Sequence, residues 1–487
     1  MSERSKDLAL IRELRGARRR ELRGTRRTAA VSSLALAVSS CISAHLDPKE
    51  LARIDETVAD RTGAAFHSAD LLATAPPTPA PAPTGELPLE EAQALALARN
   101  FALIASAESV AIAQAQLAAA GLIDNPVLNM SLRWPQSGGL ADLDLAISQV
   151  INGLWTRSTK VDIARVRRFQ SGLDLANQAF DVVEQVESKY RGLVHLVRTR
   201  DLSERIAQNY SRALEAAEAR AKVGVVPTPE VNRARVQLED AQRKVRRYEA
   251  QYKRAARELN WLLGFSSAPE WTLPAQSSAT PAALPDVPVV EDIESLGVRF
   301  RLDLQRASLD RELGHAQVHA AKLGFIPQMQ LGFDRERDET GSVKRGPTFN
   351  IVLPIFDPGF VAYELALAQE RQAEKQYAAL EGQVRQDIRS AHTSVVLDID
   401  DVVFFRDRII PQQEETVRLA QESFRQGFTD LDSLLNTLRD YVSALQSYED
   451  SLQGYYDDVV LFERAVGLVW PRIVVEARSL ESKEPKS

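Results

Sequence analysis

Apolar residues recur along much of this chain at alternating steps of three and four, the spacing of a helix that buries a narrow stripe. The clearest stripe is unbroken over ten positions: Leu434, Leu438, Tyr441, Leu445, Tyr448, Leu452, Tyr455, Val459, Phe462 and Val466. An earlier stretch has the same spacing: Val231, Ala234, Leu238, Ala241, Val245, Tyr248 and Tyr252. Stripes of this kind pack against a neighbouring helix, as in a coiled coil.

The helix that packs on the stripe from Val231 to Tyr252 is expected just upstream of that stripe. Residues from Trp155 to Lys222 contain no proline, and Val183, Val186, Tyr190, Leu193 and Val197 repeat the coiled-coil spacing. A continuous helix over these residues would be roughly 100 Å long, at about 1.5 Å per residue. In the second long helical region Pro411 is predicted to bend or break the helix, because proline lacks the donor that the helix requires.

Four short segments alternate with period two and predict β-strands: VLNMSLRW at 127–134, DLDLAIS at 142–148, QMQLGFD at 328–334 and TFNIVLPI at 348–355. Each has one apolar face, as in a membrane β-barrel, although a soluble antiparallel sheet alternates equally well. Only closed barrels can lie in lipid, since an open edge leaves backbone groups without partners. Four strands cannot close, so a membrane-spanning sheet requires several copies of the chain.

The chain also contains an internal duplication. AQAQLAAAGLIDNP at 113–126 aligns with GHAQVHAAKLGFIP at 314–327, Gly224 aligns with Gly427, and Gly264 with Gly467, all at offsets of 201 to 203 residues. This period is far longer than that of a solenoid repeat. We therefore predict two repeats, at 87–266 and 291–470, joined by a linker at 267–290 and followed by a tail at 471–487.

The N-terminus predicts export. Residues 1–27 hold ten Arg and Lys against four acids, and the uncharged stretch TAAVSSLALAVSSCISA follows. This order is typical of a secretory signal peptide, here 1–40. VSSC resembles a lipobox, which makes Cys41, the only cysteine, the expected lipidation site and 41–86 a lipid-anchored, proline-rich tether. The alternative is an ordinary signal with a chance cysteine; both Sec and Tat export stay open.

Charge and motifs argue against several functions. Without residues 1–40 the chain holds 50 basic and 63 acidic side chains, which disfavours nucleic acid as a partner. The sequence contains no nucleophile elbow, phosphate loop or paired-cysteine motif, so no enzyme activity, catalytic residue or cofactor is predicted. Glu312, His315 and His319 share a helical face, but they lack a further placed ligand, so no metal site is assigned.

Helix, two strands, long helix, tight glycine turn and long helix, twice over behind an export signal, resemble the TolC-like outer-membrane efflux proteins. The resemblance covers about residues 87–470. It is carried by Asn125-Pro126-Val127-Leu128, by the Leu353–Gly359 segment and by the turns at Gly224 and Gly427. Gly346-Pro347 and the Pro-Ile-Phe-Asp segment look more like the heavy-metal cation efflux branch than the drug branch.

The resemblance implies a mainly α fold with a small membrane β part. Three protomers would form a 12-stranded β-barrel, four strands each, above a periplasmic α-barrel of coiled-coil helices. It also implies a passive tunnel that conducts substrates from an inner-membrane pump through a periplasmic adaptor, located in the outer membrane. The alternatives are a lipid-anchored periplasmic coiled-coil scaffold and the outer-membrane duct of a type I protein secretion system. The sequence does not identify the cargo.

In this family the helix-turn-helix tips dock on the adaptor. Carried over to this chain, the docking residues are Val223, Gly224, Val225, Arg425, Gln426, Gly427 and Phe428. The alternative, that these residues only cap helices, accounts for the glycines but not for exposed Val225 and Phe428. Some relatives line the tunnel entrance with carboxylates after the glycine; the corresponding residues here are Glu230, Arg233, Ser433 and Asn436, so the resemblance does not carry over an acidic gating ring.

Overall fold

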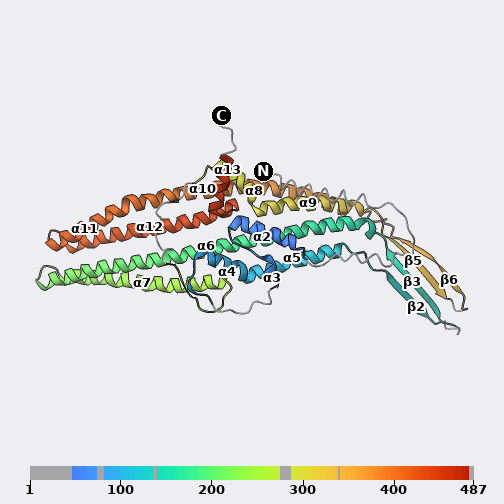
Figure 1. Cartoon of the computed structure of the whole chain (residues 1–487), viewed down its shortest axis with the longest axis horizontal. Coiled ribbons are helices and arrows are strands. Elements are labelled where there is room, and N and C mark those ends of the chain that lie inside the picture. The colour runs from blue at the N-terminus through green and yellow to red at the C-terminus, as the bar shows by residue number, and fades with distance from the viewer. Residues whose placement is uncertain are drawn as a thin grey trace, which may run out of the picture. The chain divides into compact units, whose positions relative to one another are not determined.

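The computed structural model describes residues 46–73, 82–134, 140–274, 284, 287–337 and 340–481. The predicted signal peptide and Cys41 lie outside the described residues, as do residues 135–139. Two copies of one unit follow each other along the described chain (Figure 1). The predicted fold class, mainly α with a small β part and an internal duplication, is confirmed.

In the first copy a pair of short helices precedes two strands and two long helices. The elements are α4 (Leu89–Arg99), α5 (Phe101–Ala120), β2 (Val127–Arg133), β3 (Asp142–Val150), α6 (Gly153–Lys222) and α7 (Thr228–Leu262). Asn100 separates α4 from α5, and its side-chain oxygen accepts from the backbone amides of Ala102 and Leu103 at 3.0 and 3.1 Å. This N-cap starts the second helix after the break.

The second copy repeats the order with one interruption. Its elements are α8 (Val290–Phe300), α9 (Leu302–Leu323), β5 (Met329–Arg337), β6 (Val343–Ile351), α10 (Phe360–Phe404), the π-helical turn η2 (Phe405–Ile409), α11 (Ile410–Gln426) and α12 (Leu431–Val466). The predicted break near Pro411 is confirmed: η2 ends two residues before it and interrupts the α-helix. A π-turn accommodates the carbonyl that proline leaves without a partner.

The long helix before the first turn is continuous. α6 has 70 residues, which corresponds to about 105 Å, and α7 packs back along it. Val231, Ala234 and Ala241 of the predicted stripe are buried with Tyr210 and Ala217 of α6. The coiled-coil pairing predicted from the spacing is therefore present. The stripe is the apolar face of α7, and packing on α6 buries it.

The four longer strands form one antiparallel sheet in the order β2-β3-β5-β6. Each copy contributes a hairpin, and β3 joins β5 across the duplication. The fourth strand was predicted over 348–355, but it runs over Val343–Ile351. Pro354 cannot donate to a ladder, whereas Pro347 is tolerated because β6 is an edge strand. Leu353 and Ile355 lie beyond the strand and are exposed.

Two segments outside the predicted repeats are helical. Within the expected tether, α2 (Pro48–Thr62) and α3 (Ser68–Ala73) pack on the first copy, and Val58 and Leu71 are buried. Asp47 caps α2 with Pro48 at its first position, which are ordinary start signals. Within the expected tail, α13 (Trp470–Glu481) buries Ile473 and Ala477 beside α8.

The boundary of the first copy is held by a small parallel pairing. β1 (Thr84–Glu86) pairs with β4 (Glu270–Thr272), so the residues entering and leaving this copy lie together. α5 is long and apolar enough to cross a membrane by composition. It packs along α6 with Leu103 and Ala107 fully buried, and 33 % of its apolar window is buried.

Candidate functional site: the paired hairpin tips

The first tip is the turn between α6 and α7. Gly224 has a φ of 75°, a left-handed conformation that suits glycine because it has no Cβ. Its amide donates to the carbonyl of Ala221, and the amide of Val225 donates to that of Arg220, both at 3.0 Å. The six-residue hydrogen bond satisfies a carbonyl at the end of α6, as in a Schellman cap.

The second tip, between α11 and α12, is built in the same way. Gly427 has a φ of 85°, and the amide of Phe428 donates to the carbonyl of Ser423 at 3.0 Å. Asp430 then caps α12 by accepting from the amide of Ser433 at 2.7 Å. The two glycines predicted as equivalents from the 203-residue offset therefore perform the same backbone function.

Apolar side chains project from both turns. Val223 is 73 % exposed, Val225 56 % and Phe428 80 %. Their neighbour Val226 is buried in the core that the two hairpins share, so only part of the apolar tip sequence faces water. Arg425 and Gln426 are exposed beside Phe428. Helix capping requires none of these exposed apolar groups.

The two tips lie side by side at the end of the helices away from the sheet (Figure 1). The guanidinium of Arg220 donates to the carbonyl of Phe424 at 3.0 Å and lies over its ring, 4.7 Å from the centroid. Arg233 of α7 donates to both oxygens of Asp432 of α12, at 2.6 and 2.8 Å. This hydrogen bonding raises the pKa of Arg233.

The four residues expected at the tunnel entrance have different local surroundings. Arg233 is engaged with Asp432, and Asn436 accepts from Arg439 of its own helix at 3.2 Å. Ser433 is exposed on the first turn of α12, and Glu230 is half-buried on the first turn of α7. The Arg233–Asp432 pair was not foreseen, because 199 residues separate its members and only hairpin packing joins them.

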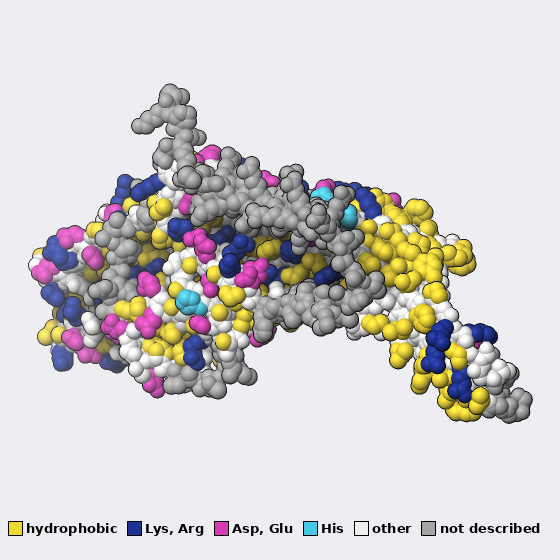
Figure 2. All heavy atoms as spheres, turned by 45° about the vertical axis from the view of Figure 1, so that its right-hand side comes forward, with side chains coloured by type: hydrophobic (Ala, Val, Ile, Leu, Met, Phe, Trp, Pro, Cys, Tyr) yellow, Lys and Arg dark blue, Asp and Glu magenta, His cyan; other side chains and the backbone are white. Residues whose placement is uncertain are grey.

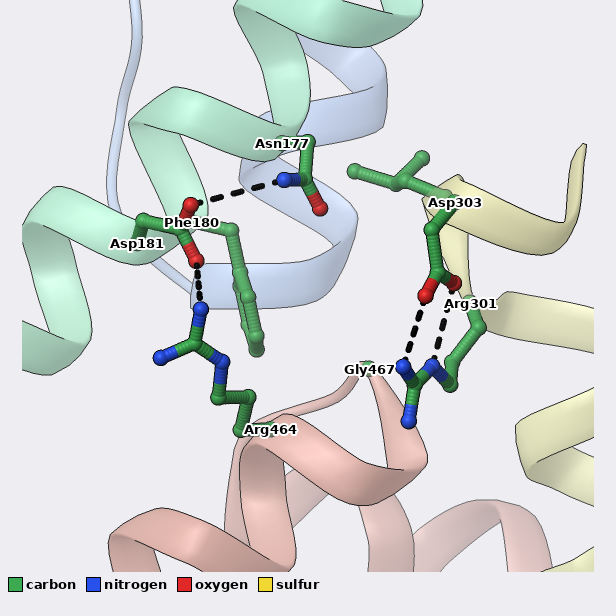
Figure 3. Close-up of a pocket in the computed structure, with 8 residues that line it drawn as sticks. Asn177, Phe180, Asp181, Arg301, Asp303, Arg464 and Gly467 are labelled. Carbon is green, nitrogen blue, oxygen red and sulfur yellow. Dashed lines mark hydrogen bonds and ion pairs between the residues drawn. The ribbon is translucent and has the colours of Figure 1, made fainter. Parts of the chain in front are cut away.

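A second group of charges joins the two copies where the C-terminal end of α12 and the N-terminal end of α9 meet α6. A pocket of about 100 Å³ is lined by Asn177, Phe180, Asp181, Arg301, Leu302, Asp303, Arg464 and Gly467 (Figure 3). Arg464 of α12 donates to Asp181 of α6 at 3.1 Å. Arg301 and Asp303 form their own pair across from it. The pocket is small and crossed by ion pairs, which is typical of an interface between packed helices.

Buried carboxylates lie beside this pocket. Burial raises the pKa of Glu184 to about 8; the carboxylates Asp181 and Glu187 add to the shift, and Arg464 opposes it. Burial likewise raises the pKa of Glu463, with Glu187 adding to the effect. Both side chains lie where α6 and α12 meet, so their protonation is linked to the contact between the copies.

The histidines considered as metal ligands have separate partners. His315 lies against Glu370 of α10, and His319 lies 3.3 Å from the hydroxyl of Thr159 on α6. The two rings therefore contact different neighbouring helices. Glu312 shares their helix, and the arrangement fits contacts between helices better than a shared ion.

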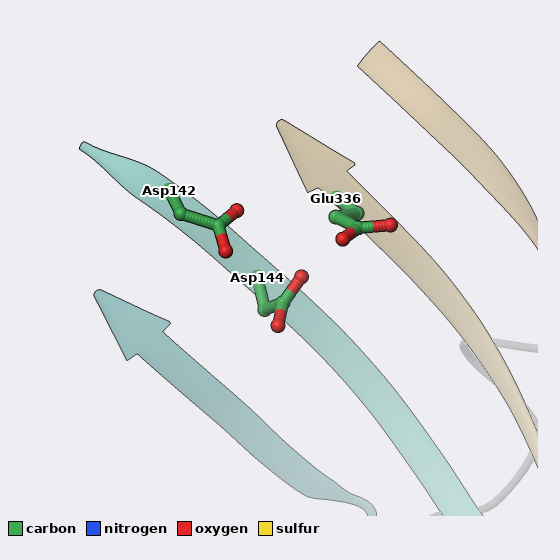
Figure 4. A group of neighbouring side chains, drawn as sticks. All are labelled: Asp142, Asp144 and Glu336. Atoms are coloured by element: carbon green, nitrogen blue, oxygen red, sulfur yellow. The ribbon is translucent and has the colours of Figure 1, made fainter. Parts of the chain in front are cut away.

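Strand pairing brings together a carboxylate group that sequence reasoning missed. Oxygens of Asp142, Asp144 and Glu336 lie within 4.8 Å of one another on β3 and β5 (Figure 4). Oxygen atoms at this spacing suit a hard divalent cation. Exposed acids often gather without one, and Arg133 lies 3.7 Å from Asp144. We therefore assign no metal to this group.

Comparison with known sequences matches this architecture. A family model described as outer membrane efflux protein matches residues 93–265 and 299–468, one segment in each copy. The cobalt-zinc-cadmium resistance protein CzcC of Cupriavidus metallidurans is 25 % identical over 357 residues, covering 72 % of this chain and 83 % of that protein. Nodulation protein T of Rhizobium leguminosarum bv. trifolii is 24 % identical over 309 residues, 61 % of this chain and 65 % of that one.

Solved structures agree in fold. A CusC structure superimposes with a TM-score of 0.66 at 16 % identity and covers 78 % of this chain and 92 % of that one. The outer membrane protein VceC of Vibrio cholerae gives a TM-score of 0.64 at 15 % identity, covering 78 % and 96 % of the two chains. With the family match extending over more than half of its length, this chain belongs to the outer membrane efflux protein family.

Proposed function

We propose that three copies of this chain form an outer-membrane tunnel that passively conducts exported substrates. The observation that carries the proposal is the open four-stranded sheet, whose edge strands β2 and β6 have ladder partners on one side only. One face of this sheet is mostly apolar. Such a sheet can enter lipid only when its edges pair with other copies.

The strand directions favour closure. β2 and β5 run away from the helices while β3 and β6 return, so β6 of one copy and β2 of the next would pair antiparallel. Three copies give twelve strands, above the minimum of about eight known for single-chain barrels. The helices of the three copies would then continue the barrel into the periplasm as an α-barrel.

The hairpin tips are proposed to dock on a periplasmic adaptor that connects the tunnel to an inner-membrane pump. Exposed Val223, Val225 and Phe428 offer two apolar points per protomer, hence six around a trimer. An apolar point surrounded by polar groups is a common anchor in protein interfaces. The residues of the entrance, Glu230, Arg233, Ser433 and Asn436, lie just behind these anchors.

We propose metal cations as the cargo. Support comes from the relative named for cobalt, zinc and cadmium resistance, of which this chain covers 83 %. Deletion of the gene should lower the metal concentration that cells tolerate, and the intact gene should restore it. Unchanged metal tolerance together with a loss of protein secretion would instead indicate the type I secretion duct.

Cys41 is proposed to carry a lipid that anchors the mature chain to the outer membrane. The proposal is supported by the VSSC sequence at the end of the uncharged stretch. Mass spectrometry of the N-terminal peptide would identify the lipid on Cys41. A mature N-terminus without lipid would leave an ordinary signal peptide, and the barrel would then be the membrane attachment.

Extraction and mass test the tunnel directly. The protein should leave membranes only with detergent, have the mass of a trimer and migrate differently on gels before and after heating, as barrels do. A lipid-anchored periplasmic scaffold would instead be released as a water-soluble monomer once the lipid is removed. That outcome would overturn the tunnel.

A further inference from the structure

Three arginines lie on the apolar face of the sheet. Direct partners in an antiparallel pair share a face, and the register forms rows across the four strands. One row is Leu128, Ile147, Phe333 and Pro347, and the next one outward is Met130, Leu145, Arg335 and Arg345. The row beyond it is Leu132, Leu143, Arg337 and Val343. The arginines are thus embedded among apolar side chains.

Arg335 and Arg345 are direct cross-strand neighbours, and like charges in this position destabilise a sheet. Among the described residues, no acidic side chain forms an ion pair with Arg335, Arg337 or Arg345. The opposite face is arranged differently: Lys344 pairs across the ladder with Glu336, and Arg133 lies beside Asp144. The polar face carries Asp142, Asp144, Asp334 and Glu336 together with Arg133 and Lys344, whereas the rows that contain the three arginines on the apolar face hold no acidic side chain.

The position of the arginines along the sheet indicates where compensation would come from. Arg335 is six residues beyond Met329, where β5 begins, which places it about 20 Å farther from the helices. Exposed Leu353, Ile355 and Phe356 continue the apolar surface at the helix end. Figure 2 shows Lys and Arg side chains beside hydrophobic ones over the sheet, and a large hydrophobic area where the sheet meets the helices.

This order corresponds to a lipid-facing surface. If the helices lie in the periplasm, the apolar rows face the acyl chains, and the arginines reach the outer headgroup level. A cation on the lipid face costs about 2 to 4 kcal/mol at the midplane of the membrane and little near the interface. Arginine long enough to extend to the headgroups binds phosphate in a two-pronged, charge-assisted geometry.

We propose that Arg335, Arg337 and Arg345 bind the phosphate groups of an anionic lipid in the outer leaflet, of the phosphorylated glycolipid type. The paired guanidinium groups of Arg335 and Arg345 hold one phosphate between them, which removes their mutual repulsion. The leucines and Met130 in the same rows contact the acyl chains. This inference rests on the proposed trimeric barrel, because the apolar face must meet lipid.

The test uses the full-length protein purified as a trimer and placed in nanodiscs. The probes are diphosphorylated lipid A and lipid A from which the phosphates have been removed, and native mass spectrometry measures the lipid retained per trimer. Each arginine near a charged surface contributes about 1 kcal/mol, so Arg335→Gln with Arg345→Gln should weaken retention about 30-fold. Dephosphorylated lipid A should be retained poorly by the unchanged protein.

Lys344→Gln is the matched control, because Lys344 adjoins Arg345 in sequence but points to the polar face. It should retain lipid A as the unchanged protein does. Equal losses in both variants would overturn the proposal, as would equal retention of the two lipids. Inorganic phosphate serves as a competitor. If it displaces lipid A while dephosphorylated lipid A is retained as well as lipid A, the arginines hold a free anion rather than a lipid, and the proposal is overturned.

The experiment separates this inference from the proposed function. If no trimer forms, the tunnel itself fails before any lipid is measured. If the trimer forms but retains lipid A and dephosphorylated lipid A equally, only the arginine site fails. Should the double variant not assemble, the comparison of phosphorylated with dephosphorylated lipid A on the unchanged trimer decides alone.

Discussion

Adjacent residues at the hairpin tip have different roles because of how the chain turns. Val226 enters the core shared by the two hairpins, whereas Val225 points into solvent. Gly224 makes the difference, since its left-handed backbone reverses the direction of the chain between α6 and α7. An exposed apolar group on a rigid turn loses little entropy when it binds a partner.

Val225→Asp should abolish export while the trimer stays assembled. A charge at an apolar anchor would weaken adaptor binding at least about tenfold, and the side chain has no contacts in the core to lose. Binding to the adaptor and metal tolerance of cells are the measurements. Val236→Asp is the matched control, because Val236 is also exposed but lies on α7 away from the turn; loss of the trimer in Val225→Asp would make the turn structural.

The Arg233–Asp432 pair joins the two hairpins near the proposed entrance. Arg233→Ala should increase the passage of ions through the purified channel, because this contact holds α7 and α12 together at their tips. Thermal stability should not change measurably, since both side chains are exposed. Exchanging the two charges, Arg233→Asp with Asp432→Arg, should restore low conductance; conductance that stays low in Arg233→Ala would exclude a role in closure.

Charged side chains join α6 of the first copy to α12 of the second. Arg464 on α12 reaches Asp181 and Glu184 on α6, and Glu463 is buried next to it. Arg464 is 61 % exposed, so these ion pairs contribute little to stability, whereas the buried carboxyl groups of Glu184 and Glu463 lose their contact with water at this interface. The contact between the repeats should therefore respond to pH.

The thermal stability of the protein should fall as pH rises from about 4.5 towards 8. Folding raises the pKa of Glu184 from 4.5 to about 8, so the folded state binds this proton more tightly. Its contribution to stability is complete below the unfolded pKa and is lost as pH rises through the folded one. Glu184→Gln should reduce the change in Tm between these pH values by several °C. Glu239→Gln, at an exposed site on α7, is the control and should leave that change as it is. Identical profiles of Tm against pH for the two variants would contradict the assignment.

For the whole molecule, the open sheet is the feature that requires other copies. Its two edges come from opposite ends of the strand order, β2 from the first copy of the duplication and β6 from the second. The duplicated unit thus supplies one edge strand that runs away from the helices, β2, and one that runs back towards them, β6. The repeat makes closure by identical copies simple.

Cysteine crosslinking should detect closure between copies. The unchanged chain has a single cysteine, Cys41, so it is the blank. Asn129→Cys on β2 combined in turn with Lys344→Cys, Thr348→Cys or Asn350→Cys on β6 should give a crosslinked trimer for one combination, because these side chains all lie on the polar face. Asn129→Cys with Ala146→Cys, direct neighbours within one protomer, should give no trimer. Absence of crosslinked trimers from all three combinations would argue against a barrel.

Local patterns in the sequence predict the repeat, the long helices, three of the four strand positions and the turns at the tips. These features depend on local spacing: a step of three and four for α7 and α12, a step of two for the strands, and glycine at the turns. Helices α2 and α13 have local signals as well, but the composition of these regions favoured the prediction of a tether and a tail. Pro354 carried the information that β6 ends before it, because proline cannot donate to a strand ladder.

Which residues from distant parts of the chain meet depends on the tertiary structure. Arg233 reaches Asp432, and Arg464 reaches Glu184, because the two hairpins pack together. Arg335 lies opposite Arg345, and Asp142 and Asp144 lie beside Glu336, through strand register. Periodicity reports which face of an element is apolar, but the partner of that face and the register between strands depend on packing of the whole chain.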